Sequence, residues 1–401
     1  MQPFLFSDHP LLFCRSNLQL FNVVLPAETA NAMYTDFREQ LCSRLAAIND
    51  AGLYDSLGTS MSTDAVIEIG GQKLLNFSSP APFALNVGQA DESQNAAALE
   101  SRIARLLNAD DCILYNSQAD ADGALTNHLL NRADAVIYNA LSQFALSGGP
   151  TFCRATKYKY HGFDTDDIEK QLKLSQAQQN RLLIVDAVDL ASGNIAPLNR
   201  IFELANRYKA IVAIDQTLSA GLIGQGGSGV CTLFDDIDVP EIQTGSLQYL
   251  GSNAGAYIAG RREIIDFLRQ QPSGITAAAP LTLQNISAAC TAIDSIVQMN
   301  TERQYILQIT NYLIKKLYCL GLEIPPTQTS RLSVMVGDSS NAETIVKQLA
   351  KKGVLVAALT SPFVSKDQCR LVLTLSASHT KDDIEKAAAA FESVLPLFPK
   401  D

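Results

Sequence analysis

Short apolar runs of strand length alternate with amphipathic helical segments through the middle of the chain. The runs are almost continuously apolar, as in strands that are buried on both faces. This alternation predicts an α/β fold with a mostly parallel sheet and helices on both faces, whose site lies at the carboxyl ends of the strands. The expected strands are Cys112–Ser117, Ala135–Tyr138, Leu182–Val188, Ala210–Asp215, Glu241–Leu247 and Ala254–Ile258, with helices in Phe163–Leu174 and Asn199–Lys209.

The chain divides into three parts by pattern. An N-terminal segment, residues 1–75, carries an amphipathic helix within Ala27–Leu57 and a hairpin around Gly70-Gly71. A large domain is expected over residues 76–321 and a smaller α/β C-terminal domain over residues 322–401. The smaller domain is expected to contain strands Leu332–Val336, Val354–Ala358 and Arg370–Leu375 and helices Ala342–Lys351 and Lys381–Leu395.

Composition excludes several classes of function. A net charge of −10 argues against nucleic-acid binding and against an anionic membrane surface. No apolar run reaches the about 18 residues that a membrane span needs. The cysteines form no C-x-x-C pair and the four histidines no metal-binding motif, so we expect reduced thiols, a cytoplasmic protein and no metal site.

Four motifs stand at the expected strand ends and loops. The longest, Thr244–Gly260, reads T-G-S-L-Q-Y-L-G-S-N-A-G-A-Y-I-A-G; the others are Ser192–Leu198 (S-G-N-I-A-P-L), Gly221–Gly224 (G-L-I-G) and Leu375–Thr380 (L-S-A-S-H-T). Together they resemble the α-oxoamine synthase family, pyridoxal-phosphate (PLP) enzymes that join an amino acid to an acyl thioester. The resemblance covers roughly Asn76 to Leu395. It implies the fold of the fold type I PLP-dependent transferases, with a mostly parallel seven-stranded sheet and a smaller C-terminal α/β domain.

Several residues match functional positions of the family. Asp215 matches the acid that pairs with the pyridinium nitrogen, and otherwise would cap the turn after its strand. Arg370 matches the arginine that binds the substrate carboxylate, and otherwise would form a surface ion pair. Thr244 and Ser246 match hydroxyls near the cofactor phosphate, and otherwise are ordinary turn hydroxyls.

The family's phosphate-binding turn, N-S-G-Y, is matched by this chain only in its first half. Asn116 and Ser117 match, but Gln118 stands where the family has glycine, and Asp120 and Asp122 follow. These two acids would repel a phosphate at the helix N-terminus. Their alternative interpretation is a favourable charge in the first helical turn.

The position of the Schiff-base lysine aligns with Tyr249. No lysine occurs between Lys209 and Lys315, and a Schiff base needs a primary amine. The family's ring-stacking histidine aligns with Gln143. On this basis we expect no covalently held cofactor, and PLP binding itself is doubtful.

Three functional hypotheses remain open. In the first, the chain is a non-catalytic accessory subunit, since serine palmitoyltransferase of this family includes a lysine-lacking subunit. It would form a homodimer, or a heterodimer with a lysine-bearing paralogue. The alternative is a PLP-independent acyltransferase that takes acyl-CoA or acyl carrier protein thioesters and uses Tyr249, Asp215 and Gln143 as catalytic groups. The third is an active PLP-dependent acyltransferase or aminotransferase.

Overall fold

The computed structural model describes residues 65–69, 71–77, 95–234, 237, 239–270, 281–361 and 364–399. The helix expected within Ala27–Leu57 lies outside these residues. The expected hairpin is present as strands β1 (Val66–Ile69) and β2 (Gln72–Asn76), which pair antiparallel. On its other edge β2 pairs in parallel with β11 (Val354–Leu355), so two segments far apart in sequence share one small sheet.

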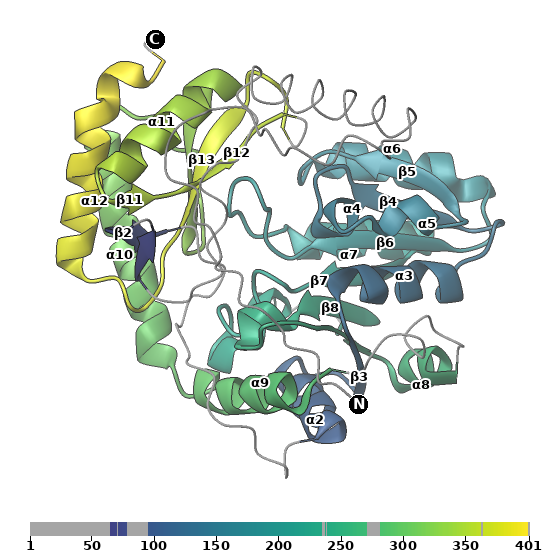
Figure 1. The fold of residues 1–401 in the computed structure, drawn as a ribbon. Helices are drawn as coiled ribbons and strands as arrows, with labels where there is room; N and C mark the ends of the chain where they lie inside the picture. Colours follow the sequence, from purple (N-terminus) through teal and green to yellow (C-terminus); the bar gives the residue numbers. More distant parts are fainter. Residues whose placement is uncertain are drawn as a thin grey trace, which may run out of the picture. The chain divides into compact units, whose positions relative to one another are not determined.

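A seven-stranded sheet forms the centre of the described chain, in the order β3-β9-β8-β7-β6-β4-β5 (Figure 1). Neighbours from β8 through β5 are parallel, and β9 is antiparallel to both β8 and β3. The predicted α/β fold with a mostly parallel sheet is therefore confirmed. The strands are β3 (Asp111–Tyr115), β4 (Ala135–Asn139), β5 (Thr156–Tyr160), β6 (Arg181–Asp186), β7 (Ile211–Asp215), β8 (Ile242–Ser246) and β9 (Ala256–Gly260).

Alternate residues of the central strands pack against different helices. Leu182, Ile184 and Ala213 belong to the hydrophobic cluster that includes residues of α3 (Gln118–Leu129) and α8 (Arg262–Gln270). Leu183 and Val212, one residue along, belong to the cluster of α6 (Thr165–Leu174) and α7 (Leu198–Tyr208). The sheet is therefore covered on both faces, because successive side chains of a strand point to opposite sides.

One edge strand was missed by the sequence analysis. Strand β5 reads Thr-Lys-Tyr-Lys-Tyr, and only Tyr160 of it is buried. Lysines on an edge strand oppose pairing with other chains, and they also hide the strand from a search for apolar runs. Two one-turn helices, α4 (Gln143–Leu146) and α5 (Gly149–Phe152), lie between β4 and β5.

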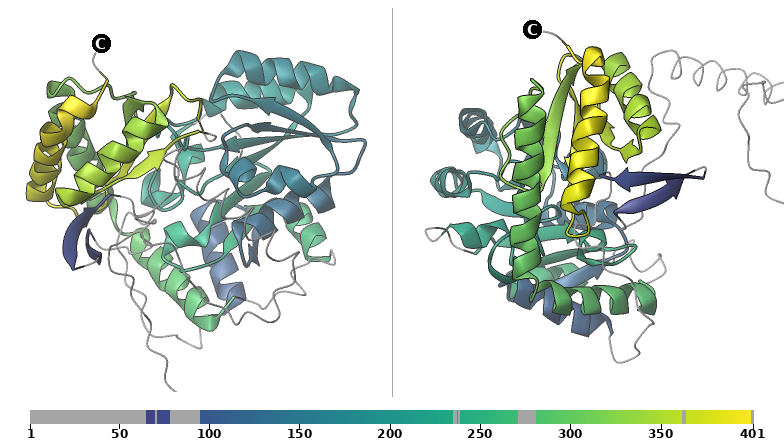
Figure 2. Two further views of the ribbon diagram at one scale, coloured as in Figure 1. Left: turned by 45° about the horizontal axis from the view of Figure 1, so that its top comes forward. Right: turned by 90° about the vertical axis from the view of Figure 1, so that its left-hand side faces the viewer.

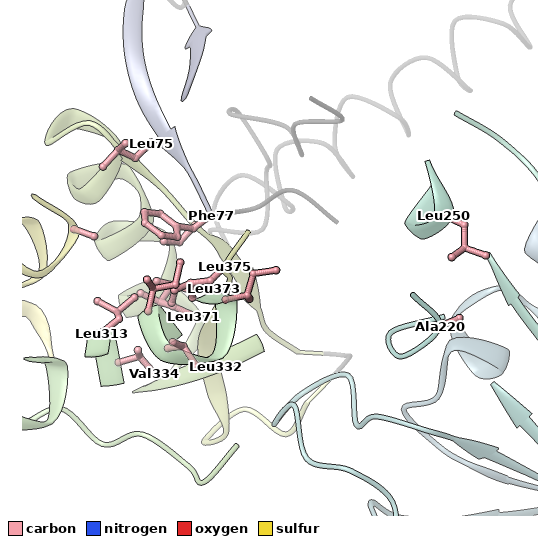
Figure 3. Close-up of a cluster of buried hydrophobic side chains, with 14 of the residues drawn as sticks. Leu75, Phe77, Ala220, Leu250, Leu313, Leu332, Val334, Leu371, Leu373 and Leu375 are labelled. Carbon is pink, nitrogen blue, oxygen red and sulfur yellow. The ribbon is translucent and has the colours of Figure 1, made fainter. Parts of the chain in front are cut away.

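The C-terminal part contains a three-stranded antiparallel sheet, β10-β13-β12. Helices α10 and α12 lie side by side in both views of Figure 2, with the sheet beside them. Leu313 of α10, Leu332, Leu371 and Phe77 lie near one another in Figure 3, and the same hydrophobic cluster extends to Leu250. The elements are α10 (Asn300–Cys319), β10 (Arg331–Gly337), α11 (Ser339–Lys351), β12 (Ala357–Leu359), β13 (Cys369–Thr374) and α12 (Lys381–Val394).

Two further helices, α2 (Ala96–Leu106) and α9 (Leu283–Ile296), contribute to the same large hydrophobic cluster. Within the part of the chain that the structure describes, no helix combines the length and the apolar character needed to cross a bilayer.

Candidate functional site

Two aspartates end neighbouring parallel strands. Asp186 ends β6 and Asp215 ends β7, and the register pairs these two residues directly. Both are almost completely buried. The Thr217 backbone N–H donates to Asp215 Oδ1 at 2.7 Å, and the Gln143 N–H donates to Asp186 Oδ1 at 3.2 Å. The other oxygen of Asp186 is buried and has no hydrogen-bond partner among the described residues.

A third buried acid comes from helix α3. Asp122 is 2% exposed and accepts hydrogen bonds from the Ser147 hydroxyl and from Gln118 Nε2, the latter at 3.2 Å. The same Gln118 nitrogen lies 3.4 Å from Asp215 Oδ2. Asp122 is thus buried and bonded within the protein, and only Asp120 fits the predicted role of a first-turn acid.

The three acids form a cluster without a paired lysine or arginine. Among the described residues, none of Asp122, Asp186 and Asp215 forms an ion pair with lysine or arginine within 4.0 Å. Burial raises the pKa of Asp215 to about 6 and that of Asp122 to about 7, and burial and the charge of Asp215 raise the pKa of Asp186. A bound cation would relieve this charge imbalance.

Tyr249 lies on the short turn η4 (Leu247–Leu250), directly after β8. The turn starts at Ser246, whose hydroxyl accepts from the Gln248 N–H, and ends at Gly251 with φ +83°. A Cβ at Gly251 would collide with Ala292 of α9. Desolvation raises the pKa of Tyr249, and the charges of Arg331 and Asp215 also act on its phenol. The charge of Asp215 therefore acts on the phenol of Tyr249, and the catalytic role expected for the two residues stays a prediction.

Two arginines come from the C-terminal sheet. Arg331 donates from Nε to the Leu190 carbonyl at 2.8 Å, and Arg370 donates to the Gln368 carbonyl at 3.1 Å. Burial lowers the pKa of both guanidinium groups, and the charge of Asp189 acts on both. Among the described residues Arg370 forms no ion pair within 4.0 Å, so the surface ion pair considered from the sequence is not found there.

The other predicted cofactor positions lie around these acids. Ser117 caps α3 by accepting from the Asp120 N–H at 3.2 Å, and Asn116 precedes it. Thr244 is buried in β8 beside Asp215. The Ser246 N–H donates to Thr217 Oγ1 at 3.1 Å, which joins the end of β8 to the loop after β7.

Sequence reasoning missed some members of the site. Asp186 carried a usable signal, since it is the one charged residue in the otherwise apolar predicted strand Leu182–Val188. Gln118 and Asp122 were noted only as departures from the family's phosphate turn. Arg331 gave no signal, because its partners Leu190 and Tyr249 are distant in sequence.

An apolar cavity of about 350 Å³ borders the loop after β7. Its lining includes Leu218, three residues beyond Asp215, and Ser330, next to Arg331. Leu222, Ile223 and Leu307 supply further apolar surface. A cavity of this size and lining is in the range of small-molecule sites.

Comparisons with known proteins identify the family. Residues 89–391 match the family described as aminotransferase class I and II. The human mitochondrial 2-amino-3-ketobutyrate coenzyme A ligase is 31% identical over 297 residues, which cover 74% of this chain and 71% of that protein. The 8-amino-7-oxononanoate synthase of Petrotoga mobilis is 26% identical over 385 residues, 90% of this chain and 98% of that protein.

The fold is also that of solved serine palmitoyltransferases. The enzyme from S. paucimobilis, in a variant with a lysine changed to alanine and with a bound PLP–myriocin aldimine, superposes with a TM-score of 0.79. It has 17% sequence identity, and the match covers 91% of this chain and 99% of that chain.

These findings correct the expectation about the cofactor. The sequence analysis expected no covalently held cofactor and doubted PLP binding, because Tyr249 aligns with the lysine. That expectation is wrong, since PLP is present in solved structures of this fold. The error lay in treating the lysine as decisive, although a ring-nitrogen acid and a phosphate-binding helix start also hold the cofactor.

Proposed function

Because the chain belongs to the aminotransferase class I and II family, and within it to the α-oxoamine synthases, we propose that it binds PLP and serves as an accessory subunit of an enzyme that condenses an acyl thioester with an amino acid. The enzyme's other subunit would be a lysine-bearing paralogue.

The residues around Asp215 fit the two ends of the cofactor. Asp215 is buried and has no positively charged ion-pair partner among the described residues. A protonated ring nitrogen would supply that positive charge. At the other end, Asn116 and Ser117 precede α3, whose first-turn N–H groups face outward from the helix start and favour an anion. Ser246 ends the neighbouring strand β8, and Thr244 lies two residues earlier in it. When bound, PLP acts as an electron sink for bonds at the amino acid's α carbon.

The observation that carries the accessory role is Tyr249 on η4, near Asp215. No lysine occurs between Lys209 and Lys315, and the raised pKa of Tyr249 keeps its phenol protonated at neutral pH. A neutral phenol can donate a hydrogen bond, but it cannot replace an amine as a nucleophile toward the cofactor. The chain's own residues can therefore bind and orient ligands, while a partner supplies the lysine.

The experiment is co-expression with a lysine-bearing α-oxoamine synthase from the same genome. We expect the two chains to co-purify, and the pair to condense amino acid and acyl thioester several-fold faster than the partner alone. Asp215→Asn should lower the PLP content of the pair, whereas the exposed Asp266→Asn should not. A partner that is equally active alone, with no complex detected, would refute the proposal.

A second candidate function is favoured by the apolar cavity. Its lining includes Leu218, Leu222, Ile223 and Leu307, which suit an acyl chain, and Leu218 follows Asp215 by three residues in the loop after β7. The chain would then transfer acyl groups from acyl-CoA or an acyl carrier protein without PLP chemistry. Thiol release on mixing the purified chain with acyl thioesters and amines would support this function. The absence of release from every thioester tried would exclude it.

A further inference from the structure

Gln118 is the first residue of helix α3, and its side chain points into the acidic site. Its Nε2 atom contacts two carboxylates, Asp122 Oδ1 at 3.2 Å and Asp215 Oδ2 at 3.4 Å. Its Oε1 atom is buried without a hydrogen-bond partner among the described residues. The amide thus stands between two acids and is itself incompletely satisfied.

Asp215 has one oxygen left for this contact. Oδ1 accepts the Thr217 backbone N–H at 2.7 Å, which fixes the carboxylate plane relative to the loop after β7. Oδ2 is the oxygen that faces the Gln118 amide. Asp215 is 4% exposed, so little water reaches it. A ligand nitrogen that pairs with Asp215 must therefore approach the oxygen beside which Gln118 already lies.

We propose that the Gln118 amide competes with ligands for the Asp215 carboxylate. A ligand displaces this amide only if it brings a protonated ring nitrogen to the carboxylate. The inference rests on the proposed PLP site and adds a determinant of how tightly that site is filled. The amide mimics the ring N–H as a donor, but it is neutral, so a cationic donor forms the stronger hydrogen bond with the carboxylate. After displacement Gln118 can keep its bond to Asp122, so the competition is modest.

The matched residue in the α-oxoamine synthases is a glycine, which has no side chain to place there. Position 118 is the first helical residue, where a change to glycine or alanine affects the helix little. Gln118→Gly and Gln118→Ala therefore remove the amide at small structural cost. Gln171→Ala is the matched control, because Gln171 makes a similar amide–carboxylate contact, 3.0 Å to Asp167, on helix α6 away from the site.

The test measures the Kd of the full chain for PLP by equilibrium dialysis. In parallel it measures the Kd for an analogue in which the ring nitrogen is replaced by carbon. We expect both Gln118 variants to bind PLP about five- to tenfold more tightly than the natural chain, the size of one weak charged hydrogen bond. The analogue should bind all variants equally, and Gln171→Ala should behave as the natural chain. Circular dichroism and urea unfolding verify that each variant folds.

An equal gain for PLP and for the analogue would overturn the proposal, since relief of crowding would then explain it. Unchanged PLP affinity in both Gln118 variants, or no PLP binding by any of the proteins, would overturn it as well. Unchanged affinity in the Gln118 variants would leave the proposed PLP site standing, whereas the absence of PLP binding by every protein would refute that site as well. The accessory role is tested separately, by the activity of the partner complex.

Discussion

The site has an acidic half and a basic half, and the two are built differently. The acidic half, Asp122, Asp186 and Asp215, lies at the strand ends of the large sheet and on α3. The basic half, Arg331 and Arg370, comes from the C-terminal sheet, where the guanidinium groups bond to carbonyls. Burial moves the pKa of each acid up and of each arginine down. Asp189 acts electrostatically on both arginines, whereas the three acids have no lysine or arginine ion-pair partner among the described residues. The charges of both halves act on Tyr249.

The strongest test of this comparison changes Tyr249 to lysine. Tyr249→Lys places an amine on η4, where the charges of Asp215 and Arg331 both act, at the position that aligns with the family's lysine. We expect treatment with PLP and borohydride to fix the cofactor covalently at residue 249 in most molecules, as measured by peptide mass spectrometry. Tyr249→Phe, the control, should give no adduct at residue 249. An adduct only at other lysines would show that η4 does not face the cofactor position.

The second test addresses the acidic half through pH. Because burial raises the pKa of Asp122 from 3.8 to about 7, the folded chain keeps a proton that the unfolded chain has released. This contribution to the unfolding free energy is therefore largest below the unfolded pKa and is lost as pH rises toward 7. Asp122→Asn should gain about 2–4 kcal/mol relative to the natural chain between about pH 4.5 and pH 8, in urea unfolding.

The exposed Asp266→Asn serves as the control for loss of one negative charge. A difference between Asp122→Asn and the natural chain that stays constant with pH would mean that Asp122 is not held protonated by the acidic half.

The third and smallest effect separates the two arginines of the basic half. Arg331→Gln removes the bond to Leu190, which links the C-terminal sheet to the loop after β6, and should cost about 1–3 kcal/mol of unfolding free energy. Arg370→Gln removes hydrogen bonds that, among the described residues, reach only Gln368, two residues away, and should change stability by less than about 0.5 kcal/mol. Equal losses of unfolding free energy in the two variants would show that Arg331 stabilises the fold no more than Arg370 does.

The sequence predicted the sheet because its central strands are buried on both faces and therefore nearly continuous in apolar residues. It missed β5, whose lysines suit an edge. Asp215 was identified from a motif, whereas the pairing of Asp186 with Asp215 depends on strand register, which no local pattern specifies. Arg331 could not be predicted as a site residue for a similar reason, since only the folded chain brings it to Leu190.

The orientation of Asp122 was also beyond sequence reasoning. The spacing placed it near a helix start, where a charge would oppose phosphate. In the structure its side chain instead bonds Ser147 and Gln118 within the protein. A charge count therefore overestimates the repulsion at that position.

The turn that carries Tyr249 is shaped by its flanks. Ser246 begins η4, and Gly251, with φ +83° and closely packed against Ala292, ends it. Residue 249 takes no part in these constraints, so its identity can drift without moving the main chain. The residues that shape this turn are thus different from the residue that would carry its reactive group. During evolution the reactive residue could therefore change while the conformation of the turn is kept.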